Sequence, residues 1–119
     1  MDVKEIFNDI SKKGLVAVLY DLYKGKFAFS MSFSEKLCIM QIENFNFSTR
    51  AKNCLLRTGI RTFGDLIKYL QDKDLSIVRN LGKKSIAEIH TKVLVIGYDF
   101  LSDSQKLSFL KDLLERNKN

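Results

Sequence analysis

Proline is absent from this sequence of 119 residues, and the chain has only six glycines, two cysteines and one histidine. It also has no low-complexity tract and no repeat of solenoid period, which excludes linker-like and repeat architectures. The hydrophobic fraction of 45% is ordinary for a protein with a folded core. The length therefore fits one compact domain, or one small domain with extensions at both ends.

The scarce cysteines and histidine exclude the usual metal and catalytic sites. Cys38 and Cys54 have no metal-ligand spacing, and the single His90 cannot complete a zinc site with them. No nucleophile or carboxylate pair accompanies His90, and the run from Gly82 to Ser85 lacks the upstream glycine of a phosphate-binding P-loop. We therefore expect no enzymatic activity, no metal and no cofactor, and we expect both thiols to be reduced core residues.

Long apolar runs are missing as well. The longest, from Leu15 to Tyr20, is too short to cross a bilayer, so we expect no membrane partner. The first five residues carry both acidic and basic side chains and lead into no apolar segment, which is unlike a secretory signal peptide. These features predict a cytoplasmic protein.

The net charge of +6 is concentrated in one segment. Residues 46–92 carry ten lysines and arginines against four acids, which gives +6, whereas the remaining ten bases balance the remaining ten acids. A localised basic surface is typical of proteins that bind phosphate groups, while dispersed charge indicates only solubility. The charge therefore predicts a phosphate-bearing partner for this segment.

The first third of the sequence gives mixed signals of secondary structure. Apolar residues at helical spacing predict an amphipathic helix from residue 3 to about Gly14. The segment 15–23 fits either a strand or a helix. Apolar residues at alternate positions (Phe27, Phe29, Met31 and Phe33), after a turn at residues 24–26, predict a small β-hairpin. Ser34 then has the position of a helix N-cap.

From Ser48 onward, helix starts and stops are clearer. Ser48 predicts an N-cap, Thr62 and Asp65 resemble a capping box, and Gly97 predicts the end of a long helix. We expect a mostly α fold, with any strands confined to the first third. The expected helices in this part cover residues 48–59, 62–70, 74–78, 82–97 and 102–117.

The turn Asn80-Leu81-Gly82-Lys83-Lys84-Ser85 places two lysines where a helix begins. The first turn of a helix exposes unpaired N–H groups and the positive end of the helix dipole, so each nearby cation costs roughly 0.3–1 kcal/mol unless an anion binds. A phosphate beside Gly82, with Lys83, Lys84 and the Ser85 hydroxyl as further ligands, would relieve this cost. The alternative is that the lysines are solvated and that Gly82 serves only a turn dihedral angle.

Residues 42–100, about half of the protein, resemble the C-terminal domain of the bacterial RNA polymerase alpha subunit. The resemblance depends on the motifs Arg50-Ala51-Lys52-Asn53-Cys54-Leu55, Gly64-Asp65-Leu66, and Asn80-Leu81-Gly82-Lys83-Lys84-Ser85 followed by Glu88-Ile89. It implies a compact helical domain with a helix-hairpin-helix element that binds the minor groove of A/T-rich DNA. The expected division is an N-terminal extension of unknown role (1–41), this domain (42–100) and a C-terminal amphipathic helix (101–119).

The resemblance also implies a role for individual residues. Arg50 would enter the groove with Asn53 beside it on the same helix, which fits the attraction of a narrow A/T minor groove for arginine. Glu88 would orient the basic groups on that face. The hairpin residues Asn80, Gly82, Lys84 and Ser85 would contact the sugar-phosphate backbone.

Two departures from the family pattern affect the interpretation. Arg79 stands where family members commonly have a proline before the turn asparagine. The long N-terminal domain through which the alpha subunit dimerises and assembles polymerase has no counterpart in residues 1–41. We therefore expect that this protein is not a complete alpha subunit, and that it works on the nucleoid or is encoded by a phage or plasmid of a bacterial host.

The alternative to DNA binding is a protein-interaction module that keeps the fold but docks on the transcription machinery. In the alpha family the same domain also meets sigma factor and transcription activators, so a free copy would compete for those partners or for RNA polymerase. The phenylalanine-rich stretch from Phe27 to Phe47 could supply a docking surface, although alternating aromatics are more often core. We prefer DNA binding, because each expected contact position holds the residue type that the chemistry needs.

Overall fold

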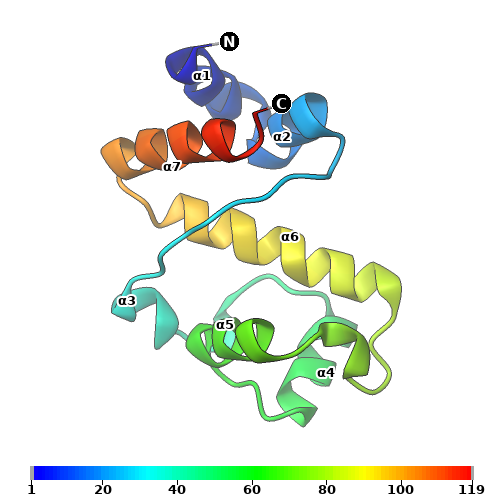
Figure 1. The fold of residues 1–119 in the computed structure, drawn as a ribbon. Coiled ribbons are helices and arrows are strands. Elements are labelled where there is room, and N and C mark those ends of the chain that lie inside the picture. The colour runs from blue at the N-terminus through cyan, green and yellow to red at the C-terminus, as the bar shows by residue number, and fades with distance from the viewer. Residues whose placement is uncertain (1, 119) are drawn as a thin grey trace. The chain divides into compact units, whose positions relative to one another are not determined.

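The computed structural model describes residues 2–118 and is helical along most of this range (Figure 1). The prediction of a mostly α fold is confirmed. Within residues 2–118 there is no strand, and Gln41 and Thr62 form an isolated β-bridge. The α-helices are α1 (Val3–Lys13), α2 (Leu15–Tyr23), α3 (Glu35–Cys38), α4 (Thr49–Arg57), α5 (Phe63–Asp72), α6 (Lys83–Asp99) and α7 (Asp103–Arg116), and the short 3-10 helices are η1 (Ile42–Asn44) and η2 (Leu75–Ile77).

The helices form two compact units. The central unit, Phe33–Leu94, contains α3, η1, α4, α5, η2 and most of α6. The terminal unit combines the described residues up to Ser32 with those from Val95 onward, so it holds α1, α2, α7 and the end of α6. The division of the sequence at residues 41 and 100 remains a prediction.

Side-chain caps fix the helix starts of the central unit, as the sequence predicted. The hydroxyls of Ser34 and Ser48 accept hydrogen bonds from the third residue of α3 and α4, at 3.2 Å in both cases. Thr62 and Asp65 form the predicted capping box at the start of α5, and Asp74 caps η2. Each cap satisfies an N–H group that the first turn leaves unpaired.

The core of the central unit is built from the apolar faces of these capped helices. Gly64 lies at a close contact, because a Cβ atom placed there would lie 3.0 Å from the Cys38 carbonyl oxygen and 3.1 Å from the Cys38 Cβ. The motif Gly64-Asp65-Leu66 therefore has a packing role between α5 and the end of α3. The buried side chains are Leu37, Ile42, Phe47, Ala51, Cys54, Leu55, Ile60, Phe63, Leu66, Leu75, Val78, Leu81, Ile89, Val93 and Leu94.

The predicted β-hairpin in the first third is wrong, since α2 occupies residues 15–23 and no strand follows it within the described residues. Asn117 explains why residue 28 needs no strand partner. Its side-chain amide accepts a hydrogen bond from the Ala28 N–H (2.8 Å) and donates one to the Ala28 carbonyl (2.7 Å). The aromatic rings pack in a row instead, with Phe29 edge-on to Phe109 of α7 at 6.2 Å between centroids.

The predicted end of the long helix at Gly97 is also wrong, because α6 continues to Asp99. Gly97 is buried inside this helix, and the next residue, Tyr98, packs its ring against Phe109 at 6.0 Å between centroids. Tertiary packing of this kind routinely outweighs the roughly 1 kcal/mol helix penalty of a single glycine. No helix within residues 2–118 is both long enough and apolar enough to span a membrane.

Candidate nucleic-acid interface

The first turns of α4 and α6 both carry cations where acids are usual. Neither helix has an acidic residue in its first turn, whereas α1, α3, α5 and α7 each have one. Arg50 is the second residue of α4, and Lys83 and Lys84 open α6; all three side chains are exposed. None of them forms an ion pair within residues 2–118. Both helix starts thus combine a positive dipole end with unneutralised cations.

The turn before α6 takes its special backbone geometry at Asn80, not at Gly82. Asn80 has a φ of 67°, in the left-handed region that asparagine tolerates better than most residues. Gly82 has no positive φ, and a Cβ atom built on it meets no atom within 4 Å. The explanation that Gly82 serves a turn dihedral angle is therefore wrong. The fold would tolerate a side chain at position 82. Because glycine has none, the space directly before α6 is open.

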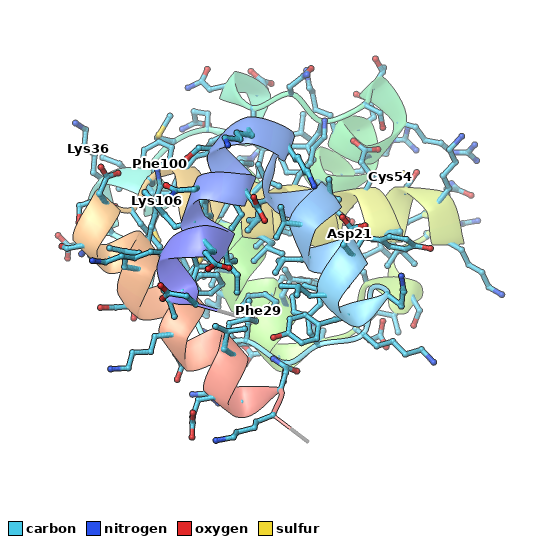
Figure 2. All side chains as sticks on the ribbon, turned by 90° about the horizontal axis from the view of Figure 1, so that it is seen from above. Asp21, Phe29, Lys36, Cys54, Phe100 and Lys106 are labelled. Atoms are coloured by element: carbon cyan, nitrogen blue, oxygen red, sulfur yellow. The ribbon has the colours of Figure 1, made fainter. Side chains whose placement is uncertain are left out.

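Two hydrogen bonds tie α4 to this turn and to α6. The backbone N–H of Ser48, the N-cap of α4, donates to Glu88 Oε2 on α6 at 2.7 Å. The thiol of Cys54, labelled in Figure 2, donates to the carbonyl oxygen of Asn80 at 3.6 Å. The helix that carries Arg50 and Asn53 is thus joined to α6 at its start and to the Asn80–Ser85 turn at its middle.

Glu88 is held in its charged form by these contacts. Partial burial opposes ionisation, but the backbone N–H and side chain of Ser48, together with the charge of Lys92, outweigh it and lower the pKa of Glu88. Lys92 Nζ lies 3.6 Å from Glu88 Oε2, one helical turn away, and also lies over the Phe47 ring at 5.8 Å from its centroid. Glu88 therefore positions the start of α4 and is not free to bind an external cation.

Acid should weaken the hydrogen bond between the Ser48 N–H and the Glu88 carboxylate. A carboxyl whose pKa is lower in the folded protein stabilises the fold above its unfolded pKa, near 4.5, and loses that contribution as the pH falls through the folded value. We expect Glu88→Gln to lower the free energy of unfolding by about 1 kcal/mol at neutral pH, because a partly exposed charged hydrogen bond becomes a neutral one. The difference should vanish well below pH 4.5. Denaturant unfolding at both pH values measures it.

Glu43→Gln is the matched control for this experiment. Glu43 is exposed and accepts no hydrogen bond from the described residues, so its replacement should leave stability unchanged at either pH. Equal effects of the two substitutions would contradict the role given to Glu88.

The structure places the eight predicted site residues on two connected elements. Arg50 and Asn53 are exposed on α4, while Asn80, Gly82, Lys83 and Lys84 are exposed on the turn and the start of α6. Ser85 is buried, with 9% of its surface exposed, and Glu88 is half-buried behind it. Within this group, Asn80 and Glu88 connect the two elements through Cys54 and Ser48.

Sequence reasoning missed the connecting residues. Ser48 was expected only as an N-cap and Cys54 only as core, and no local pattern links Ser48 to a side chain forty residues away. Lys92 is different, because its spacing of four residues from Glu88 predicts an ion pair on a helix.

Comparison with known proteins gives a match over the central unit. The family model for the C-terminal domain of the bacterial RNA polymerase alpha chain matches residues 32–94, which coincide with the central unit to within one residue. Similar curated proteins include the DNA-directed RNA polymerase subunit alpha of Carboxydothermus hydrogenoformans, 42% identical over 71 residues, and that of Symbiobacterium thermophilum, 45% identical over 62 residues. The subunit of Wolinella succinogenes is 44% identical over 68 residues. No solved structure matches the protein significantly.

These alignments cover part of each protein. They include 60%, 52% and 57% of this chain but 22%, 19% and 20% of the three alpha subunits, so the chain spans about a fifth of the length of the curated relatives that it matches. The family match, in contrast, extends over more than half of the sequence and contains every residue of the interface described above. The protein therefore belongs to the family defined by the C-terminal domain of the bacterial RNA polymerase alpha chain.

Proposed function

We propose that the central unit is a transcription-related DNA-binding domain that contacts the minor groove of A/T-rich DNA. Arg50 enters the groove, with Asn53 beside it, and the turn from Asn80 to Ser85 binds the sugar-phosphate backbone. The observation that carries the proposal is the hydrogen bond from Ser48 to Glu88, because it holds the start of α4 beside α6. Two elements held together in this way contact one duplex in a fixed register.

Electrostatics supports the same assignment. Cations at helix starts repel the helix dipole, at roughly 0.3–1 kcal/mol each, and an anionic ligand converts this cost into attraction. The exposed cations at both starts lack internal acidic partners within residues 2–118, so a phosphate backbone meets them without breaking existing ion pairs. An A/T-rich minor groove is narrow and has an enhanced negative potential, which favours insertion of an arginine such as Arg50.

Gly82 supports the backbone contact. Its position directly before α6 exposes the N–H groups of the first helical turn, and nothing in the fold occupies the space where its side chain would be. A phosphate oxygen needs such an opening to reach backbone N–H groups. Lys83 and Lys84 flank this opening with exposed side chains.

The test is a titration of labelled A/T-rich and G/C-rich duplexes at several salt concentrations. The A/T-rich duplex should bind more tightly, and the logarithm of its affinity should fall with the logarithm of salt at a slope of about 0.9 per neutralised phosphate. One small domain makes few phosphate contacts, so dissociation constants in the range of about 10⁻⁴ to 10⁻⁶ M are expected. Equal affinity for both duplexes would contradict the minor-groove mechanism.

The alternative function, docking on sigma factor, activators or RNA polymerase, has a weaker basis. Several rings of the phenylalanine-rich stretch pack against other rings: Phe33 and Phe45 both contact Phe63, at 5.4 and 5.5 Å between centroids. They are therefore engaged inside the unit. A pull-down of sigma factor or polymerase that is unaffected by Arg50→Ala would favour the alternative. Under either proposed function the domain binds other molecules and catalyses no reaction. We place it with the transcription machinery in a bacterial cytoplasm.

A further inference from the structure

A cluster of four cations lies in the terminal unit, outside the interface described above. The four side chains line one open pocket together with Leu22, Tyr23 and Asn117, and no acidic side chain belongs to the lining. These four residues, the basic cluster, are Lys24, Lys26, Arg116 and Lys118. Charge counting along the sequence does not reveal them, because the ten bases outside residues 46–92 are balanced by ten acids. The fold gathers four of these ten bases at one place.

Asn117 brings the two halves of the basic cluster together. Its side-chain amide accepts from the Ala28 N–H at 2.8 Å and donates to the Ala28 carbonyl at 2.7 Å and to the Leu113 carbonyl at 2.8 Å. The segment after α2, which carries Lys24 and Lys26, is thereby fastened to the end of α7. The pocket is therefore built by contacts between residues that are far apart in the sequence.

The neighbouring helix ends and acids neutralise only part of this charge. Cations are usual at helix C-termini, and the ends of α2 and α7 together supply about one negative charge. The ion pair of Arg116 with Asp112, at 2.6 Å, supplies a second negative charge. The three lysines of the basic cluster form no ion pair within residues 2–118. About two positive charges are therefore left unbalanced beside the pocket.

The charged groups at the pocket have the chemistry that a phosphate group needs. Lysine and arginine side chains donate hydrogen bonds and accept none. Arg116 contacts Asp112 through Nε, and its two Nη groups form no hydrogen bond within residues 2–118. Lysines act as point charges on flexible stems, so they bind phosphates without reading a base. This set of donors suits the repeated phosphates of a nucleic-acid backbone.

We propose that the basic cluster binds the sugar-phosphate backbone of DNA, as a second contact separate from the interface on the central unit. The three lysines neutralise phosphates, and the Nη groups of Arg116 donate to a phosphate oxygen. The inference rests on the proposed function, because it takes DNA as the ligand. A second site on the same chain strengthens binding to a duplex, because the first contact raises the effective concentration of the second.

A DNA titration of the full-length protein at several salt concentrations tests the second contact. Lys26→Gln with Lys118→Gln replaces two exposed lysines of the basic cluster. This double variant should lower the salt slope by about 2, or about 0.9 per lost phosphate contact, and weaken binding by about tenfold at low salt. The preference for A/T-rich DNA should remain, because Arg50 is unchanged.

Lys4→Gln with Lys111→Gln is the matched control. Both lysines are exposed on helices of the terminal unit, on α1 and α7, and neither lines the pocket. The control removes the same charge and should leave the salt slope unchanged. Equal slopes in the two double variants would overturn the proposal, because they would reduce the basic cluster to net charge.

Nuclear magnetic resonance separates this contact from the central interface. In isotope-labelled protein carrying Arg50→Ala and Gly82→Asp, which should disable the central interface, an A/T-rich duplex should still shift the amide signals of Lys26 and Lys118. Inorganic phosphate should shift the same signals only at much higher concentration, because it lacks neighbouring phosphates. Shifts by inorganic phosphate without shifts by the duplex would overturn the proposal and assign the pocket to a small anion. Absence of shifts with both probes would overturn it as well.

The two proposals fail in different ways. Equal affinity of the wild type for A/T-rich and G/C-rich duplexes contradicts the minor-groove mechanism, but leaves the second contact standing if Lys26→Gln with Lys118→Gln still lowers the salt slope. A wild-type salt slope in that double variant, together with a preserved A/T preference, contradicts only the second contact.

Discussion

Replacing Gly82 with aspartate is expected to stabilise the central unit and to remove most of its affinity for DNA. The residue immediately precedes α6, and its carbonyl accepts the first hydrogen bond of that helix from Ile86 N–H at 3.0 Å. Aspartate is a better N-cap than glycine and complements the positive end of the helix dipole, so stability should rise by about 0.5 kcal/mol. The space around the new side chain is open, so no strain offsets this gain.

The same carboxylate would occupy the place that we assign to a DNA phosphate. It neutralises the exposed N–H groups of α6 and repels the phosphate, so the affinity for an A/T-rich duplex should fall by at least about thirtyfold, or about 2 kcal/mol. Thermal unfolding and a DNA titration of the same sample measure the two opposite effects. Gly82→Asn is the control, because asparagine caps a helix equally well without adding charge.

The comparison of these two variants separates charge from size. Gly82→Asn should bind DNA more weakly than the wild type, because its side chain partly fills the opening, yet clearly better than Gly82→Asp. Wild-type affinity in Gly82→Asp would show that no phosphate approaches this helix start.

Arg50→Ala should abolish the preference for A/T-rich DNA. The arginine is exposed, makes no ion pair within residues 2–118 and lies in the first turn of α4, so its removal should change stability by less than about 0.5 kcal/mol. Loss of a groove-inserted arginine should weaken binding to the A/T-rich duplex by about tenfold to a hundredfold. Binding to the G/C-rich duplex should change much less, because that groove is wider and attracts arginine less strongly.

Arg61→Ala is the matched control for Arg50→Ala. Arg61 is also exposed and also belongs to the central unit, but it lies between α4 and α5 and is not among the proposed contacts. Its removal deletes the same charge and should weaken binding to both duplexes slightly and equally. If the two variants behave alike, the interface attracts DNA by net charge alone and Arg50 has no special place in the groove.

Helix starts and ends were mostly predictable, because they depend on neighbours in the sequence. Ser48, Thr62 with Asp65, and Asp74 each cap the helix that they were expected to cap. Helix α7 was expected beyond Ser102, and in the structure Ser102 caps it in a capping box with Gln105. A cap joins residues two or three positions apart, so a short stretch of the sequence shows both partners of the hydrogen bond.

The errors arose where distant parts of the protein decide the local structure. Alternating aromatic residues near Phe29 predicted a hairpin, but Asn117, far along the sequence, supplies both hydrogen bonds that a partner strand would have given to Ala28. Gly97 predicted a helix end, but the contact of Tyr98 with Phe109 favours continuation of α6. In both cases long-range packing outweighed a local preference of about 1 kcal/mol or less.

The sequence by itself determined the helical composition, the basic segment from residue 46 to 92, and the motifs that relate it to the alpha-subunit domain. These depend on residue type and short spacing. Only the tertiary structure decided that Ser48 and Glu88 join the start of α4 to α6, because a hydrogen bond across forty residues leaves no local pattern. It also decided that Asn80, not Gly82, has the left-handed backbone, since φ is set by how the turn closes against its neighbours. That result leaves the opening at Gly82 without a structural role and makes it the position to test first.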